Sequence, residues 1–113
     1  MTDTENQFEI LKEQLNRFLE ERNWFKYHTP KNIAMSIAIE AAELMELFQW
    51  EDPPAKQILD DAGILAQVED ELADILIYAI SLARTLKIDL FSCITAKMDK
   101  NNERFPPNNT KLG

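Results

Sequence analysis

The chain has 113 residues, a formal net charge of −8 and a hydrophobic fraction of 45%, with only two glycines and five prolines. This composition is typical of a helical globular protein and excludes a disordered chain or a turn-rich β fold. The acidic balance opposes binding to a nucleic-acid polymer, which requires a surface of Lys and Arg to neutralise phosphates. We expect residues 1–113 to form a single domain, with a flexible tail from about residue 105.

The location of the protein is predicted from what the sequence lacks. No apolar run approaches the roughly 18 residues of a membrane span. Residues 1–20 are charged and amphipathic, unlike a secretory signal. The single cysteine, Cys93, has no internal disulfide partner and agrees with a reducing compartment. We therefore expect a cytoplasmic protein without membrane contact.

The first half of the chain predicts two helices. Apolar residues recur at helical spacing over residues 5–22, and charged residues lie between them. A loop follows over residues 23–29. Thr29 and Pro30 form a typical helix start, a capping residue followed by a proline at the first helical position. This second helix is expected to run to about Trp50, before Asp52, Pro53 and Pro54 end it.

The second half predicts a short helical turn and two further helices. Residues 55–62 are polar and suit the short turn, and Gly63 marks a bend or a helix start. Residues 64–86 form a long periodic segment, and Asp89 is the expected cap of a last helix that ends before Pro106 and Pro107. The fold class is therefore all-α, a bundle of four main helices. Because helices with such wide apolar faces need a partner in a small domain, we expect a homodimer or homotetramer.

Two pairs of carboxylates lie inside the two most apolar segments. Glu40 and Glu43, and likewise Glu71 and Asp74, are three residues apart, so each pair shares one helix face. At about 100° per residue, both pairs fall among the apolar residues expected to face the core. If the two helices run antiparallel, both pairs stand at the same height, because about seven residues separate each pair from the connection between the helices.

Carboxylates removed from water require a cation or another donor to compensate them, and a metal ion is the favoured one. Four oxygen ligands favour Mg²⁺, or Mn²⁺ as a substitute, over zinc or copper, which more often bind His or Cys. Mg²⁺ keeps positions for water and for substrate phosphates, so the pocket suits hydrolysis of a phosphoanhydride. A di-iron centre is disfavoured because such bundles use E-x-x-H pairs, and the only histidine, His28, lies outside any such pair.

Structural explanations compete with each of these assignments. The four acids could rotate to a subunit edge and pair with Lys or Arg. Trp24, Trp50 and Tyr78 are of a type that more often anchors a core or an interface. His28 is expected to be a pre-helix residue with a structural hydrogen bond, and Lys97 to be solvated on the last helix.

The arrangement of motifs resembles a known family. E-A-A-E at 40–43 followed by E-L-A-D at 71–74 resembles the E-x-x-E…E-x-x-D signature of the MazG-like, all-α nucleoside triphosphate pyrophosphohydrolases. Five further segments, in the same order, resemble the dCTP pyrophosphatase-like branch of that family. They are E-R-N-W at 21–24, H-T-P-K-N at 28–32, E-L-F-Q-W at 46–50, D-I-L-I-Y at 74–78 and K-M-D-K-N at 97–101.

The resemblance implies an activity and roles for individual residues. The activity is Mg²⁺-dependent hydrolysis of a (deoxy)nucleoside triphosphate, dCTP or a modified dCTP, to the monophosphate and pyrophosphate, which cleanses the nucleotide pool. The residues it assigns to catalysis and metal binding are Glu40, Glu43, Glu71 and Asp74, with Glu40 orienting or deprotonating the attacking water. The residues it assigns to the nucleotide are Trp24, Trp50 and Tyr78 around base and sugar, and Lys97 and Asn101 at polar groups.

Several points stay open at this level. Leu15 stands where similar animal enzymes have a histidine near the base, and Phe105 replaces a frequent tyrosine, so the preferred base is not fixed. A non-catalytic helical interaction module and a nucleotide sensor that binds without cleaving are the alternatives to an enzyme.

Overall fold

The computed structural model describes the backbone of residues 3–107 and the side chains of residues 7–107. Its elements, in chain order, are α1 (Asp3–Glu21), the 3-10 helix η1 (Phe25–Tyr27), α2 (Pro30–Glu46), α3 (Ala55–Leu59), α4 (Ala62–Thr85) and α5 (Leu90–Arg104). The described residues contain no strand. The predicted all-α class with four main helices is confirmed.

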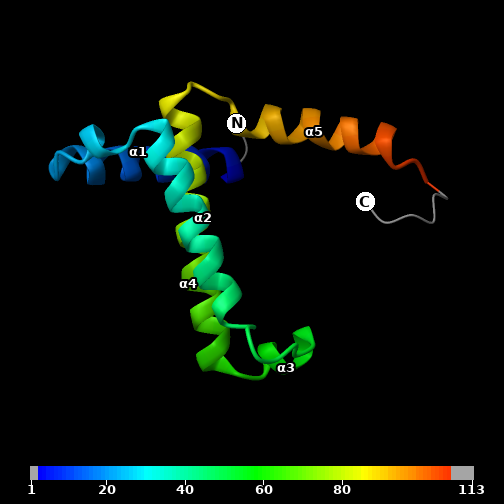
Figure 1. Ribbon diagram of the computed structural model, residues 1–113. Coiled ribbons are helices and arrows are strands. Elements are labelled where there is room, and N and C mark those ends of the chain that lie inside the picture. Colours follow the sequence, from blue (N-terminus) through cyan, green and yellow to red (C-terminus); the bar gives the residue numbers. More distant parts are fainter. Residues whose placement is uncertain (1–2, 108–113) are drawn as a thin grey trace.

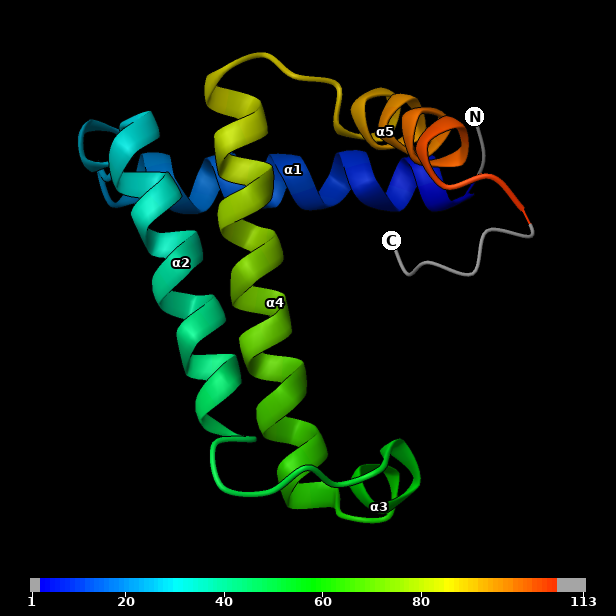
Figure 2. The same ribbon diagram turned by 45° about the vertical axis from the view of Figure 1, so that its right-hand side comes forward.

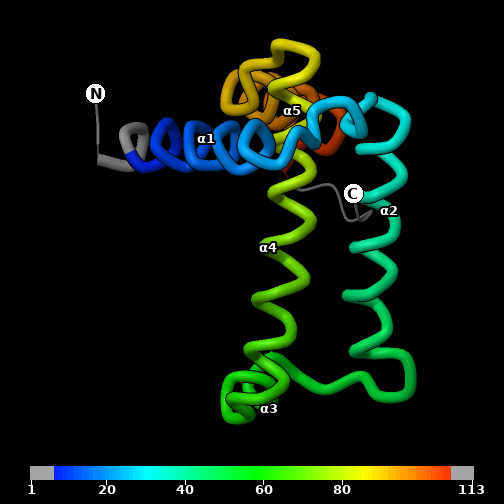
Figure 3. Tube along the Cα trace, turned by 90° about the vertical axis from the view of Figure 1, so that its left-hand side faces the viewer, coloured from blue at the N-terminus to red at the C-terminus, as the bar shows by residue number. Residues whose placement is uncertain are grey.

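Helices α2 and α4 form the central pair of the fold. They lie side by side along nearly their whole length and run in opposite directions (Figures 1 and 3). The short α3 lies in the connection between them, at the lower end of the pair (Figure 2). This antiparallel arrangement is the one that places the two carboxylate pairs at the same height.

The ends of the helices follow local capping chemistry. The Thr29 side chain accepts a hydrogen bond from the Asn32 N–H at 3.2 Å, and Pro30 occupies the first turn of α2. Asp89 accepts from the Ser92 N–H at 3.2 Å and begins α5. Both caps were predicted. Asp61 caps α4 by accepting from the N–H groups of residues 63 and 64, so α4 begins at Ala62, two residues before the predicted position.

The C-terminal boundary predicted for the second helix was wrong. Helix α2 ends at Glu46 and not near Trp50. After Glu46, the N–H groups of Leu47, Phe48 and Gln49 bond to carbonyls three residues earlier, so the last carbonyls are satisfied by tighter turns. The prolines end the segment as expected, but the α-helical bonding stops one turn earlier.

Helices α1 and α5 lie at the upper end of the pair. Helix α1 crosses that end, and α5 projects away from it beside the N-terminal part of α1 (Figure 2). The buried hydrophobic side chains gather where α1, α2 and α4 meet, and they are Leu19, Ile33, Ile80 and Ala83. Helix α5 ends at Arg104, with Phe105 half-buried, and most of the predicted tail falls outside the described residues.

Large apolar side chains remain exposed along the central pair. Met35 and Ile39 on α2, and Leu72 and Leu76 on α4, are each about half exposed. Within residues 3–107, no helix is both long and apolar enough to cross a membrane.

Candidate active site

The acid cluster is formed where the two central helices face each other. Glu40 and Glu43 lie one turn apart on α2, and Glu71 and Asp74 one turn apart on α4. Carboxylate oxygens of Glu40, Glu43 and Glu71 all lie within 4.8 Å of one another. The predicted convergence of the two pairs is therefore observed for three of the four acids, and Asp74 lies close enough for its charge to act on Glu40 and Glu71.

Two oxygens of the cluster are buried without a partner. Glu40 Oε2 and Glu71 Oε2 are shielded from solvent and make no hydrogen bond to any described residue. A buried polar atom without a partner is uncommon, and an absent ion or water is one of its ordinary explanations. These two atoms lie on opposite helices, so one group between them could satisfy both.

The electrostatics of the cluster oppose full ionisation of its carboxyl groups. Burial raises the pKa of Glu40 from its ordinary 4.5 to about 7, and the neighbouring carboxyls of Glu43, Glu71 and Asp74 act in the same direction. Burial also raises the pKa of Glu71, with Glu43 and Asp74 contributing. The ion pairs among the described side chains, Lys12 with Glu9 and Arg22 with Glu21, are both on or beside α1. Among the described side chains of the single chain, no Lys or Arg forms an ion pair with the cluster.

The donor set suits a hard divalent cation. Three carboxylates that converge on one point, with two unsatisfied buried oxygens, offer oxygen ligands only, a donor set that could bind a metal ion. The geometry thus fits the metal site expected from the sequence, and it could hold the cation that lowers the cost of the crowded charges.

A small hollow adjoins the cluster. It has a volume of about 220 Å³, and its lining includes Trp24, Tyr27, His28, Ser36 and Tyr78. Ser36 lies four residues before Glu40 on α2, and Tyr78 four residues after Asp74 on α4. At 1.5 Å per residue, these two lining residues therefore lie about 6 Å along their helices from Glu40 and Asp74.

An aromatic pair forms part of this hollow. The rings of His28 and Tyr78 are stacked, with centroids 6.3 Å apart and an angle of 29° between their planes. The His28 Nδ1 atom is buried and has no partner among the described residues, so the expected side-chain hydrogen bond is not formed there. Burial and the positive charge of Arg84 lower the pKa of His28 and favour the neutral ring. Flat faces and an unpaired nitrogen suit contact with a heterocycle.

Sequence reasoning did not assign His28, Asn32 or Ser36 to this hollow. His28 and Asn32 flank the Thr29–Pro30 cap, and the cap fixes both relative to α2. The Asn32 side chain also donates to the Tyr27 carbonyl at 3.1 Å and holds η1 against α2. The cap was a signal for the start of α2, but it does not predict the path of the loop before the helix.

The other predicted nucleotide contacts are distributed differently. Trp24 and Tyr78 both line the hollow. Trp50 is 86% exposed and follows the end of α2. Lys97 and Asn101 lie on α5, which projects away from the pair of α2 and α4 within one chain (Figure 1). The structure brings two of these five residues together, and roles for the other three remain predictions.

Comparison with known proteins identifies the family of the chain. The model of the MazG-like family matches residues 35–111, more than half of the chain and including all four acids. The chain belongs to the MazG-like family. A pyrophosphatase from Archaeoglobus fulgidus of known crystal structure is 40% identical, with a TM-score of 0.81, covering 88% of this chain and 93% of that one.

Two curated relatives of this MazG-like protein carry a more specific name. The dCTP pyrophosphatase 1 of Bos taurus is 38% identical over 91 residues, and that of Homo sapiens is 37% identical over 91 residues. Each match covers 79% of this chain and 53% of the relative. The chain therefore spans about half the length of these curated relatives.

Proposed function

We propose that this MazG-like protein is a Mg²⁺-dependent nucleoside triphosphate pyrophosphohydrolase. Its substrate would be a (deoxy)nucleoside triphosphate, dCTP or a modified dCTP, and its products the nucleoside monophosphate and pyrophosphate. The observation that carries the proposal is the convergence of three carboxylates beside a hollow of about 220 Å³ that is lined in part by aromatic side chains. The pyrophosphatase neighbour in structure and the dCTP pyrophosphatases in sequence support it.

The residues that would hold the metal are Glu40, Glu43, Glu71 and Asp74. Their support is the oxygen donor set and the two buried oxygens without a partner. When bound, Mg²⁺ would supply charge neutralisation for the phosphates and make a water more acidic. Within this set, we assign to Glu40 the orientation or deprotonation of the attacking water. A carboxylate held beside the attacking water could accept its proton.

The hollow beside the acids would hold the base and sugar. Trp24, His28 and Tyr78 supply aromatic surface. A base placed there would leave the triphosphate extended toward the acids, about one helical turn away. This placement would orient the bond between the α and β phosphorus atoms relative to the carboxylates.

Three further predicted contacts belong to the same proposal. Trp50 would complete the surroundings of the base, and Lys97 and Asn101 would reach polar groups of the nucleotide. Their support is the resemblance of their segments, because within one chain α5 extends away from the acids. The protein would act as a homodimer or homotetramer, and the half-exposed apolar side chains of the central pair support this state. We retain a cytoplasmic location as a prediction.

A product assay tests the activity. The protein is incubated with each dNTP and Mg²⁺, and the products are separated by ion-exchange chromatography. Monophosphate plus pyrophosphate is the expected result, whereas diphosphate plus orthophosphate would mean that a different bond is cleaved. A stable complex with intact dNTP and Mg²⁺ would instead identify a nucleotide sensor. If no nucleotide binds at all, the remaining alternative is a non-catalytic helical interaction module. A panel of normal, methylated and oxidised nucleoside triphosphates then fixes the base.

A further inference from the structure

A second and larger cavity lies away from the acid cluster. It has a volume of about 510 Å³ and opens between α1, the C-terminal end of α4 and the start of α5. Its volume falls within the range of about 300 to 1,000 Å³ that is common for small-molecule sites. None of its lining residues belongs to the acid cluster or to the His28–Tyr78 hollow. The cavity is therefore a separate feature of the fold.

Two phenylalanines form an aromatic wall in this cavity. Phe8 on α1 and Phe91 on α5 have ring centroids 4.6 Å apart, at an angle of 58°. Phe91 is still 50% exposed, so the pair leaves aromatic surface open to the cavity. Such surface stacks well with a planar heterocycle.

Three cationic side chains line the same cavity, although the protein carries a net charge of −8. They are Lys12, Arg84 and Lys87. Among the described side chains, neither Arg84 nor Lys87 forms an ion pair, because the ion pairs found there involve only Lys12 and Arg22. Arg84 Nε is buried and has no acceptor. The rest of the Arg84 guanidinium is engaged, because it lies 4.5 Å from the centre of the Phe25 ring and donates to the Thr85 hydroxyl at 3.4 Å. Among the described residues, Lys87 is therefore the cation of the cavity that has no side-chain partner.

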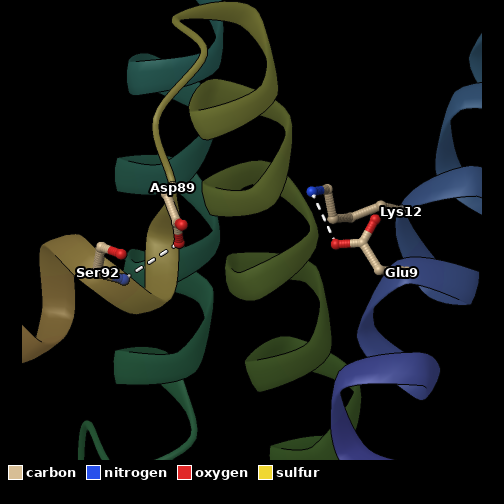
Figure 4. A network of polar contacts seen from close by, with 4 residues as sticks. All are labelled: Glu9, Lys12, Asp89 and Ser92. Carbon is tan, nitrogen blue, oxygen red and sulfur yellow. Dashed lines mark hydrogen bonds and ion pairs between the residues drawn. The ribbon is translucent and has the colours of Figure 1, made fainter. Parts of the chain in front are cut away.

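The two carboxylates of the cavity are already engaged (Figure 4). Glu9 accepts from Lys12 Nζ at 3.4 Å, and Asp89 accepts from the Ser92 N–H at 3.2 Å. The Asp89 carboxylate is therefore committed to capping α5. Lys12 lies close enough to Asp89 to lower the pKa of that carboxyl, after the larger effect of the Ser92 hydrogen bonds. The cations of the cavity thus exceed its carboxylates by one.

The backbone of Lys87 is an independent observation on this cavity. Its φ is 57°, in the left-handed region, and it follows the end of α4, where the Ile88 N–H bonds to the Ala83 carbonyl at 2.8 Å. Glycine is the usual residue at such a helix end, because a β-carbon is strained there. Strained positions that keep a functional side chain cluster at ligand sites. Here the strain accompanies a lysine that lines the cavity.

We propose that this cavity is a second nucleotide-binding site. The base would stack on the Phe8–Phe91 pair, and the phosphate would accept hydrogen bonds from Lys87 and from Lys12 beside it. An anion with an aromatic body satisfies both the unpaired Lys87 and the open aromatic surface, whereas a purely apolar ligand would leave Lys87 without a partner. The proposal requires no divalent metal, because the two lysines supply the positive charge.

Equilibrium binding in the presence of a chelator tests the site. Without metal, the acid cluster repels phosphates, so binding there is suppressed. dCMP, inorganic pyrophosphate and deoxycytidine are titrated into the intact chain by calorimetry. We expect dCMP to bind with one site per chain and more tightly than either fragment. Lys87→Gln should weaken dCMP binding about tenfold, the loss typical of one charge-assisted hydrogen bond.

Matched variants separate the site from the rest of the protein. Lys87 is exposed, so its replacement should leave the fold intact, and Phe91→Ala tests the aromatic wall in the same way. Lys56→Gln, an exposed lysine on α3 at the opposite end of the helix pair, should change nothing.

Three results would overturn the proposal. They are no binding of dCMP in chelator, equal weakening by Lys87→Gln and Lys56→Gln, or a change of oligomeric state in Lys87→Gln with unchanged nucleotide binding. The last would make the cavity a contact between copies of the chain. Because no turnover is measured, failure of the proposed catalytic activity would leave this test unaffected.

Discussion

Glu40 on α2 and Glu71 on α4 face each other across the central helix pair, and each has one buried carboxylate oxygen without a hydrogen-bond partner. This relationship links sequence to function, because two acids 31 positions apart share one small volume only when the helices run antiparallel. Packing alone would not select it, since like charges in a shielded place repel. A bound cation would attract these carboxylates and offset the repulsion between them.

Replacing one acid should separate catalysis from stability. We expect Glu71→Gln to lower kcat at least about 100-fold, because it removes a charged oxygen from the metal site. The metal-free variant should be at least as stable as the parent chain, because a crowded carboxylate is gone. Steady-state kinetics with dCTP and Mg²⁺, and thermal denaturation in chelator, measure the two effects.

The control for this variant lies on the same helix. Glu69→Gln changes an exposed acid two residues from Glu71 and should alter neither kcat nor stability appreciably. Equal loss of activity in both variants would show that activity depends on the total charge of α4, and this result would contradict a specific site at Glu71.

The raised pKa of Glu40 predicts how stability depends on pH. In the folded chain this pKa is about 7, against an ordinary value of 4.5. Between these values the unfolded chain has lost the proton and the folded chain retains it. The unfolded state then binds fewer protons, so the stability of the metal-free protein should fall as the pH rises from about 4.5 to 7.

Chemical denaturation in chelator at several pH values between 4.5 and 8 measures this slope. Other carboxyls also titrate, so the informative quantity is the difference between the parent chain and Glu40→Gln. The variant should gain stability relative to the parent as the pH rises. A constant difference across the range would show that Glu40 ionises normally in the folded protein.

Mg²⁺ should reverse the same effect. A ligand that binds only the folded state raises its stability. The melting temperature of the parent chain at pH 7.5 should therefore rise by several degrees with millimolar Mg²⁺, and that of Glu71→Gln should rise less. An equal rise in both proteins would point to nonspecific screening of the net charge of −8.

Part of this site could be predicted from the sequence because helical periodicity is a local property. The spacing of Glu40 with Glu43, and of Glu71 with Asp74, placed each pair on one face. The equal distance to the connection did not hold, because Glu43 lies 3 residues before the end of α2 and Glu71 lies 9 residues after the start of α4. The antiparallel packing of the two helices brings the pairs together. The end of α2 was misplaced because apolar residues continue to Trp50, whereas hydrogen bonding changes after Glu46. Periodicity does not report that change.

The hollow beside the acids was less predictable. The stacking of His28 on Tyr78 joins a pre-helix loop to a helix 50 residues later, and no local pattern encodes the angle at which that loop returns. The cavity at Phe8 and Phe91 arises in the same way, from the crossing of α1 and α5. Contacts of this kind depend on how whole helices are oriented.

The aromatic hollow makes a prediction for substrate binding. Tyr78→Ala should raise KM about tenfold or more with a smaller effect on kcat, because stacking on a base contributes about 1 to 3 kcal/mol. Tyr78→Phe keeps the ring and should behave much like the parent chain. Initial rates over a range of dCTP concentrations decide between them. A KM unchanged in Tyr78→Ala would place the base elsewhere.

The left-handed backbone at Lys87 predicts a stabilising substitution. Lys87→Gly removes the strain of a β-carbon at φ 57° and should raise the free energy of unfolding by up to about 1 kcal/mol. Lys87→Ala keeps the β-carbon and should not. Urea denaturation of the two variants measures the difference. If both variants respond alike, the strain at this position is negligible.

The exposed faces of the central pair predict how copies of the chain associate. Ile39 on α2 and Leu76 on α4 are 55% and 52% exposed, although each lies in the most apolar part of its helix. Burying such side chains contributes about 25 cal/mol per Å².

Sedimentation velocity should show a dimer or tetramer for the parent chain, and Leu76→Glu should dissociate it, because a charge would be buried without a partner. Leu59→Glu alters an apolar residue of α3 that is 67% exposed and should leave the assembly unchanged. A parent chain that sediments as a monomer, or a Leu76→Glu variant that keeps the parent's state, would exclude this face as the contact.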